Sequence, residues 1–171
     1  MKSSLLISTL FFGTTLAASA QRPPRAAELD RLGFLVGEFR GEVEFQVPGS
    51  PPAKAPMNYR AAWELDSAWV VAHYDQSPRN VPLRGMLLYT WDLPKRHYLF
   101  YGLANAPMEP SAMRGSFEGA RLVFVGDTTK TPAYRETWEP QGPDTLVTTL
   151  AYRRQGEWVV GSRAVLVRVK R

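Results

Sequence analysis

Only two residues in the sequence are histidines, and one of them could serve acid–base chemistry. His73 precedes Asp75 by two positions in AWVVAHYD, so both side chains leave one face of an extended strand. That spacing separates them by roughly 6.5–7 Å, so a direct hydrogen bond is not assured. Histidine titrates near neutral pH, which makes His73 the candidate base of a small hydrolase or isomerase. The commoner arrangement is a histidine satisfied inside an apolar core, and His97, which follows Lys95 and Arg96, is expected at the surface.

Other catalytic and metal-binding patterns are missing from the sequence. It contains no cysteine and no closely spaced histidine pair, so it has no zinc motif. It has no Gly-x-Ser-x-Gly nucleophile motif, and Gly115 and Gly119 belong to a predicted hairpin rather than a phosphate loop. The acidic pair Glu136 and Glu139 is expected on polar strand faces or strand ends. We therefore expect no metal and no cofactor, and we favour a binding protein over an enzyme.

Aromatic residues are the positive signal for a binding site. Tyrosine and tryptophan join a large apolar ring to a polar group that needs a partner when buried. A pocket that is mostly apolar, with a few polar anchors, is the usual site for a small molecule. The alternative is that these rings only pack the core. The predicted pocket lining consists of Tyr59, Trp63, Trp69, His73, Tyr89, Trp91 and Arg163.

The elements that must position these residues are short and mostly extended. Residues 29–36 place apolar side chains on one helical stripe, which predicts a short helix ending at Gly37. Alternating strands separated by turn residues follow, and closure of sequential hairpins removes exposed edges. The sequence thus predicts an all-β fold, an up-and-down antiparallel β-barrel of about ten strands with a short N-terminal helix. The expected strands are 39–47, 57–65, 68–75, 83–91, 96–103, 112–117, 121–126, 133–139, 145–153 and 157–169.

The N-terminal segment has the pattern of a secretory signal peptide. A lysine at position 2, a short apolar run and the small-x-small motif Ala18-Ser19-Ala20 predict cleavage near Ala20-Gln21. The expected organisation is a signal peptide (1–20), an extended leader (21–28) and one barrel domain (29–171). No later segment is apolar enough to span a membrane as a helix, and a periplasmic or secreted location is expected.

Charge and composition limit the partners that we expect. The chain carries 21 Lys and Arg against 16 Asp and Glu, a net charge of +5. The basic residues are scattered, whereas a nucleic-acid binder concentrates them on one face, so no nucleic-acid partner is expected. Exposed strand faces could be covered by solvent or by a second copy, so the sequence leaves monomer and homodimer open.

A short helix followed by Gly-x-aromatic-x-Gly resembles the start of the calycin superfamily, which includes lipocalins, fatty-acid-binding proteins and nitrobindins. The motif here is Gly37, Phe39 and Gly41, with phenylalanine where lipocalins have tryptophan. The resemblance implies that an arginine near the end of the last strand packs over this ring, and Arg163 and Arg168 are the candidates. Nitrobindins bind haem through a histidine near the C-terminus, and VVGSRAVLVRV contains none. Haem binding through His73, His97 or a tyrosine is left open and is not favoured.

The order of several segments also resembles a bacterial family of exported proteins known only as a domain of unknown function. These segments are LGFLVGEFRGEVEF, AAWELDSAWVVAHYD, PLRGMLLYTWDLPKRHYLFYG and MRGSFEGARLVFVG. That resemblance implies a lipocalin-like barrel and supplies no activity.

Strict alternation along the last strand predicts that Arg163 faces inward with Val159, Val165 and Val167. An inward arginine needs a partner, either the Phe39 ring or a ligand carboxylate, and we favour the ring.

The sequence therefore predicts an exported barrel that binds a small apolar or amphipathic molecule in its interior. One alternative is a filled barrel that binds another protein through loops 48–56, 76–82 and 104–111. The other is the small hydrolase or isomerase using His73.

Overall fold

The computed structural model describes residues 25–46, 49–77, 81–106 and 109–170. The expected signal peptide and its cleavage position lie outside these residues, as do residues 21–24 of the expected leader. Among the residues described, no helix has the length and apolar character needed to cross a membrane.

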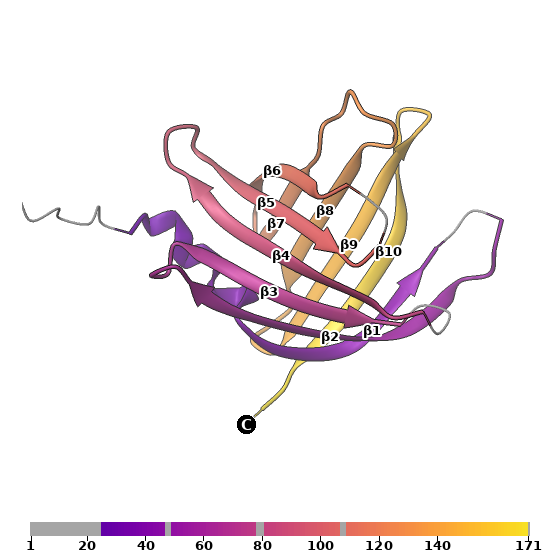
Figure 1. Cartoon of the computed structure of the whole chain (residues 1–171), viewed down its shortest axis with the longest axis horizontal. Coiled ribbons are helices and arrows are strands. Elements are labelled where there is room, and N and C mark those ends of the chain that lie inside the picture. Colours follow the sequence, from indigo (N-terminus) through magenta and orange to yellow (C-terminus); the bar gives the residue numbers. More distant parts are fainter. Residues whose placement is uncertain (1–24, 47–48, 78–80, 107–108, 171) are drawn as a thin grey trace, which may run out of the picture.

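Ten antiparallel strands close into one barrel, in which each strand pairs with its chain neighbours and β10 pairs with β1 (Figure 1). This confirms the expected all-β, up-and-down barrel with a short N-terminal helix, which is a 3-10 helix. The elements are η1 (Ala27–Leu35), β1 (Gly37–Phe45), β2 (Ala53–Glu64), β3 (Trp69–Gln76), β4 (Leu83–Asp92), β5 (His97–Ala104), β6 (Ser111–Glu118), β7 (Arg121–Val125), β8 (Tyr134–Pro140), β9 (Thr145–Arg154) and β10 (Glu157–Arg168).

The second strand begins earlier than the sequence predicts. Residues 48–56 are proline-rich and were expected to form a loop, yet β2 begins at Ala53. Ala55 and Met57 are buried while Pro56 between them is exposed, so the alternation of a strand continues through the proline. The extra length lets β2 pair with the whole of β1, from Gly37 opposite Ala61 to Phe45 opposite Ala53.

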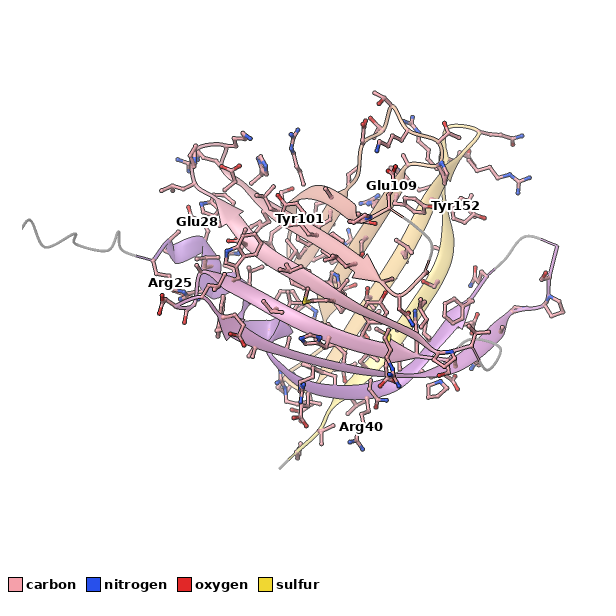
Figure 2. All side chains as sticks on the ribbon, viewed as in Figure 1. Arg25, Glu28, Arg40, Tyr101, Glu109 and Tyr152 are labelled. Carbon is pink, nitrogen blue, oxygen red and sulfur yellow. The ribbon has the colours of Figure 1, made fainter. Side chains whose placement is uncertain are left out.

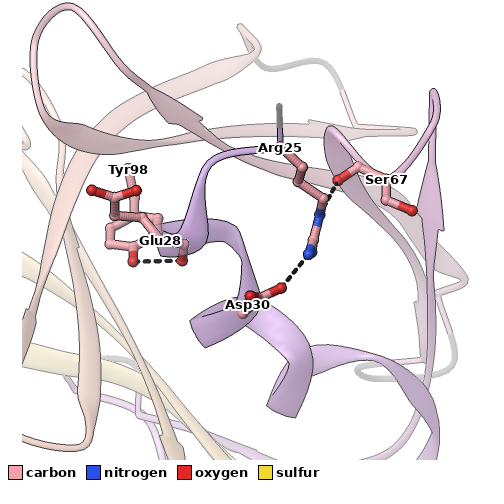
Figure 3. A network of polar contacts seen from close by, with 5 residues as sticks. All are labelled: Arg25, Glu28, Asp30, Ser67 and Tyr98. Carbon is pink, nitrogen blue, oxygen red and sulfur yellow. Dashed lines mark hydrogen bonds and ion pairs between the residues drawn. The ribbon is translucent and has the colours of Figure 1, made fainter. Parts of the chain in front are cut away.

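Helix η1 closes one end of the barrel, at the left of Figure 1. Leu29, Leu32 and Leu35 are buried and join the barrel core. The Tyr98 hydroxyl donates a hydrogen bond of 2.9 Å to the backbone carbonyl of Glu28 (Figure 3). These contacts fill this end, so any internal space must lie toward the opposite end.

Arg25, just before η1, ties the helix to the turn between β2 and β3. Its Nε donates a hydrogen bond of 2.9 Å to the carbonyl of Ser67, and its guanidinium forms an ion pair with Asp30 (Figure 3). The same guanidinium lies 4.3 Å from the ring centroid of Trp63. Three elements of the closed end are thus held by one side chain.

Arg168, at the end of β10, fastens the last strand to the first. Its guanidinium carbon lies 4.3 Å from the centroid of the Phe39 ring, and Nη1 donates a hydrogen bond of 2.8 Å to the Val36 carbonyl. Phe39 is only 2% exposed. Of the two arginines considered for this contact, the structure places Arg168 over the ring and Arg163 elsewhere.

Glycine is required on both sides of Phe39, because atoms of β10 lie too close to leave room for a Cβ at either position. Gly37 has φ of 135°, and a Cβ there would lie 2.2 Å from Nη1 of Arg168. A Cβ on Gly41 would lie 1.9 Å from the carbonyl oxygen of Val165 on β10. A side chain at either position would push β1 away from β10 or displace the arginine.

We expect Arg168→Ala to lower the free energy of unfolding by about 2 kcal/mol, because it removes a cation–π contact and a charged hydrogen bond. Urea unfolding followed by tryptophan fluorescence measures the loss. Arg163→Ala is the matched control, since it removes an exposed arginine from the same strand; it should change stability by less than about 0.5 kcal/mol. Equal losses in the two variants would contradict a closing role for Arg168.

Candidate functional site

Aromatic rings fill the middle of the barrel around Trp138 of β8. Trp138 is 1% exposed, and its ring centroid lies 5.2 Å from that of Tyr59 and 6.1 Å from that of Tyr89. Tyr89 also packs against Phe100 and Phe124, with centroids 5.3 Å and 5.9 Å away. The pairs are tilted or edge-on, which is the favoured arrangement of aromatic rings.

A carboxyl group lies next to this aromatic cluster. Glu136 stands two residues before Trp138 on β8, so its side chain leaves the same inner face. The Trp138 indole N–H donates a hydrogen bond of 2.7 Å to Oε1 of Glu136. Burial raises the pKa of the Glu136 carboxyl to about 7, although the hydrogen bond from Trp138 acts in the opposite direction.

Tyrosine hydroxyls surround the carboxyl but do not donate to it. Burial raises the pKa of Tyr59, Tyr74 and Tyr89, and the negative charge of Glu136 raises each further. The hydroxyls of Tyr59 and Tyr89 influence each other's ionisation, yet neither makes a well-formed hydrogen bond to any described residue. The site is therefore neutral apart from Glu136.

Two small cavities meet at Glu136, toward the end of the barrel opposite η1. One, of about 120 Å³, lies toward β1, β2 and β10, and the other, of about 130 Å³, lies toward β5 and β6. Four residues line both: Tyr74, Leu87, Glu136 and Leu150. We call the two together the mouth cavity. Glu109, at its rim, lies on the side of the molecule away from Glu28 of η1 (Figure 2).

The walls of the mouth cavity are mostly apolar, with a few hydroxyl and amide groups. Met57, Leu87 and Phe100 supply apolar contact, while Thr148 and Ser162 supply hydroxyls. Each lobe is smaller than the roughly 300 Å³ at the lower end of drug-sized sites. Such a cavity suits a small molecule with one polar group that can meet Glu136.

Two predicted site residues lie at the centre of the barrel and two at its closed end. Tyr59 and Tyr89 are 1% and 0% exposed and form part of the aromatic cluster. Trp63 and Trp91 are partly buried near η1, where Trp63 lies under Arg25 and Trp91 packs 4.8 Å from Tyr98, between ring centroids. None of the four lines the mouth cavity, so they belong to the packing of the barrel core and its closed end.

The remaining predicted residues face outward. His73 is exposed, and it lies in an open outer groove of about 500 Å³ beside Arg60, Asp75 and Arg84. Trp69 lies on the same face of β3 and packs 6.1 Å, between centroids, from Tyr101. The inner face of β3 is the other one, with Val70 and Ala72 fully buried. The prediction of an inward His73 is wrong because both faces of β3 carry apolar residues. Alternation alone did not show which face is inside.

Arg163 is also exposed, in contrast to the inward direction predicted for it. Val159 pairs with Tyr152, but Ser162 pairs with Leu150, so β10 contains one extra residue between them. This bulge at Gly161 ends the alternation that linked Arg163 to Val159. Ala164 and Leu166 are buried instead, and Val165 and Val167 face outward with Arg163.

Sequence reasoning missed the carboxyl and its neighbours. Glu136 was expected on a polar face, yet it points inward. The signal was present in β8, since Tyr134, Glu136 and Trp138 share a face and the largest apolar residue of the strand marks the inner one. Tyr74 also lines the cavity, because it shares the inner face of β3 with Val70 and Ala72, opposite to the face of His73.

The mouth cavity does not fit a haem held by histidine. His73 lies on the outer face, and His97 lies at a strand end with Nε2 4.0 Å from a carboxylate oxygen of Asp92. Neither lines the cavity, which is also smaller than a drug-sized site. Within the part of the chain that the structure describes, no three histidine, cysteine or acidic residues gather as metal ligands do.

We expect Glu136 to make stability fall as pH rises from about 4.5 to about 7. The folded pKa of about 7 lies above the ordinary value of 4.5, so the folded chain binds more protons across this window. The stabilisation that protonated Glu136 contributes is fully present below pH 4.5 and is lost near pH 7. The free energy of unfolding changes by about 2–3 kcal/mol across this window.

Urea unfolding of the wild type and of Glu136→Gln, repeated from pH 4.5 to pH 7.5, tests this expectation. The wild type should lose stability relative to Glu136→Gln as pH rises, because the glutamine cannot ionise in the barrel interior. Glu139→Gln, which changes an outward residue of the same strand, controls for the loss of a charge. A difference that does not vary with pH would show that Glu136 titrates normally in the folded chain.

Comparison with known proteins supports the fold. No family model matches the sequence, and no curated protein matches it either. The crystal structure of Rv2717c from M. tuberculosis is similar, with a TM-score of 0.64 and 15% identity over 86% of this chain and 100% of that chain. An S-type phycobiliprotein lyase, CPES from Guillardia theta, gives a TM-score of 0.61 and 14% identity over 86% of this chain and 95% of that chain. At these identities the likeness concerns the fold alone.

Proposed function

We propose that the protein binds a small amphipathic molecule in the mouth cavity, with its polar group beside Glu136. One observation carries the proposal: the buried carboxyl group of Glu136 meets two adjoining cavities whose other walls are largely apolar, with Glu109 at the rim. Empty space beside a buried polar group is unfavourable unless water or a ligand occupies it. The opposite end is filled by η1, so a ligand would enter from the end at which Glu109 lies.

The position of the cavity favours binding over catalysis. The groups that interact with Glu136 are tyrosine hydroxyls and the Trp138 indole, none of which is an activated nucleophile. His73, the candidate base, faces away from this space. The fold shared with a phycobiliprotein lyase supports the barrel, whereas the ligand has to be argued from the cavity of this chain.

A filled barrel that acts through its loops is the alternative. The loops considered for that role connect β1 to β2, β3 to β4 and β5 to β6. An empty or water-filled mouth cavity that accepts no organic molecule would leave this alternative in place.

Blocking the cavity should abolish binding. Leu150 lines both lobes, so Leu150→Trp should fill them and weaken binding of the neutral probe 2-phenylethanol by about tenfold or more. Saturation-transfer NMR measures this weak binding directly. Thr149→Trp places the same ring on the outer face of the same strand, opposite Arg163, and should leave binding unchanged. If 2-phenylethanol bound equally to both variants, its site would lie elsewhere.

We also propose that the protein works after export, in keeping with the signal-peptide pattern of residues 1–20. Mass spectrometry of protein recovered from the periplasm of an expressing bacterium should give a chain beginning at Gln21. Ala20→Arg should block this processing, because the cleavage site needs a small residue there. Recovery of the unprocessed wild-type chain from the cytoplasm would contradict export.

A further inference from the structure

The charges that face the mouth cavity are all negative. Of its described lining residues, only Glu136 and Glu109 are ionisable at neutral pH, and no lysine, arginine or histidine is among them. Glu109 lies at the rim and is partnered by Lys130, with Nζ 3.6 Å from Oε2. Glu136 is therefore the one interior charge. Its sign is opposite to the net charge of the chain, which is +5.

The Glu136 carboxyl has room for a further hydrogen-bond donor. Oε1 accepts the Trp138 N–H, and no described residue donates a hydrogen bond to Oε2. A buried carboxylate with one donor is incompletely satisfied, because each oxygen can accept about two hydrogen bonds. A ligand that brings N–H groups would complete the set, whereas a ligand that brings only acceptors would not.

The walls around Glu136 suit a compact cation. Rings of Tyr74 and Trp138 line the cavity and can present their faces to a positive charge. The hydroxyl oxygens of Thr148 and Ser162 can accept the N–H groups that Glu136 leaves unpaired. A carboxylate ligand would instead meet a like charge in a medium where repulsion is strong.

We propose that the mouth cavity selects a small protonated primary amine over neutral or acidic molecules of the same shape, and that Glu136 makes this selection. This inference rests on the proposed function, because it names the chemistry of the ligand in that same cavity. The limited volume of each lobe restricts the apolar part of the amine to a single ring or a short chain.

Amine binding should depend on pH in a way that neutral binding does not. Glu136 must be ionised to pair with an ammonium group, so affinity should rise up to about pH 7 and then level off. No other group near it changes charge in this range, since the tyrosines stay neutral. The groups that face Glu136 from the neighbouring strands are Tyr59, Tyr74, Tyr89, Phe124 and Leu150.

Three probes of similar shape test the selection on the full chain: 2-phenylethylamine, 2-phenylethanol and 3-phenylpropionate. Titration followed by NMR at pH 7.5 should show the amine binding about tenfold or more tightly than the alcohol, and the acid more weakly than the alcohol. Glu136→Gln keeps an oxygen that can accept the Trp138 N–H and nearly preserves the volume. In this variant the advantage of the amine should vanish, while the affinity for the alcohol stays within about threefold.

The outcomes separate the two proposals. If the wild type binds amine and alcohol equally, or if Glu136→Gln keeps the preference, the selection by Glu136 is overturned and the binding site stands. If no probe binds the wild type, both proposals fail. If Glu136→Gln does not fold, the order of the three probe affinities in the wild type decides whether the proposed selection stands. Glu109→Gln is the matched control at the rim, and the amine preference should survive it because Lys130 already pairs with that carboxylate.

Discussion

The interior of this barrel depends on the hydrogen bond between the Trp138 indole and the Glu136 carboxyl. A carboxyl group among apolar side chains is unfavourable, and a lone charge there more so. Trp138 relieves part of this cost by donating its N–H, and its ring also fills the centre of the barrel between Tyr59 and Tyr89. The same side chain thus packs the core and accounts for one hydrogen bond of the buried carboxyl group that faces the cavity.

The two ends of the barrel differ in how completely side chains fill them. At the closed end, η1 and Arg25 cover the rings, and Arg168 fastens β10 over Phe39. Phe39 packs against Tyr59, and Tyr59 against Trp138, so packed rings run from the closing arginine to the site. Because side chains fill the barrel up to Trp138, free space is left only beyond it. The position of the cavity therefore follows from how the other end is closed.

Surface and interior carry opposite electrostatic character. Arginines such as Arg60, Arg84 and Arg163 are exposed, where water solvates them. In the described part of the interior, Glu136 is the acidic group, and burial raises its pKa. The interior of the described barrel is therefore neutral at low pH and becomes negative once Glu136 ionises. Ligand choice can therefore be set by one residue without altering the rest of the protein.

The sequence by itself determined the class of fold, because alternating apolar residues and closely spaced turns leave few arrangements other than a hairpin barrel. It also pointed to the Gly37–Phe39–Gly41 segment as a closure. It could not show which face of a strand lies inside. In β3 and β10 both faces carry apolar residues, and the bulge at Gly161 shifts the alternation by one. Only the tertiary structure decided that Glu136 points inward and that His73 and Arg163 point outward. When ten strands pair in one closed register, the inner and outer face of every strand is set at once.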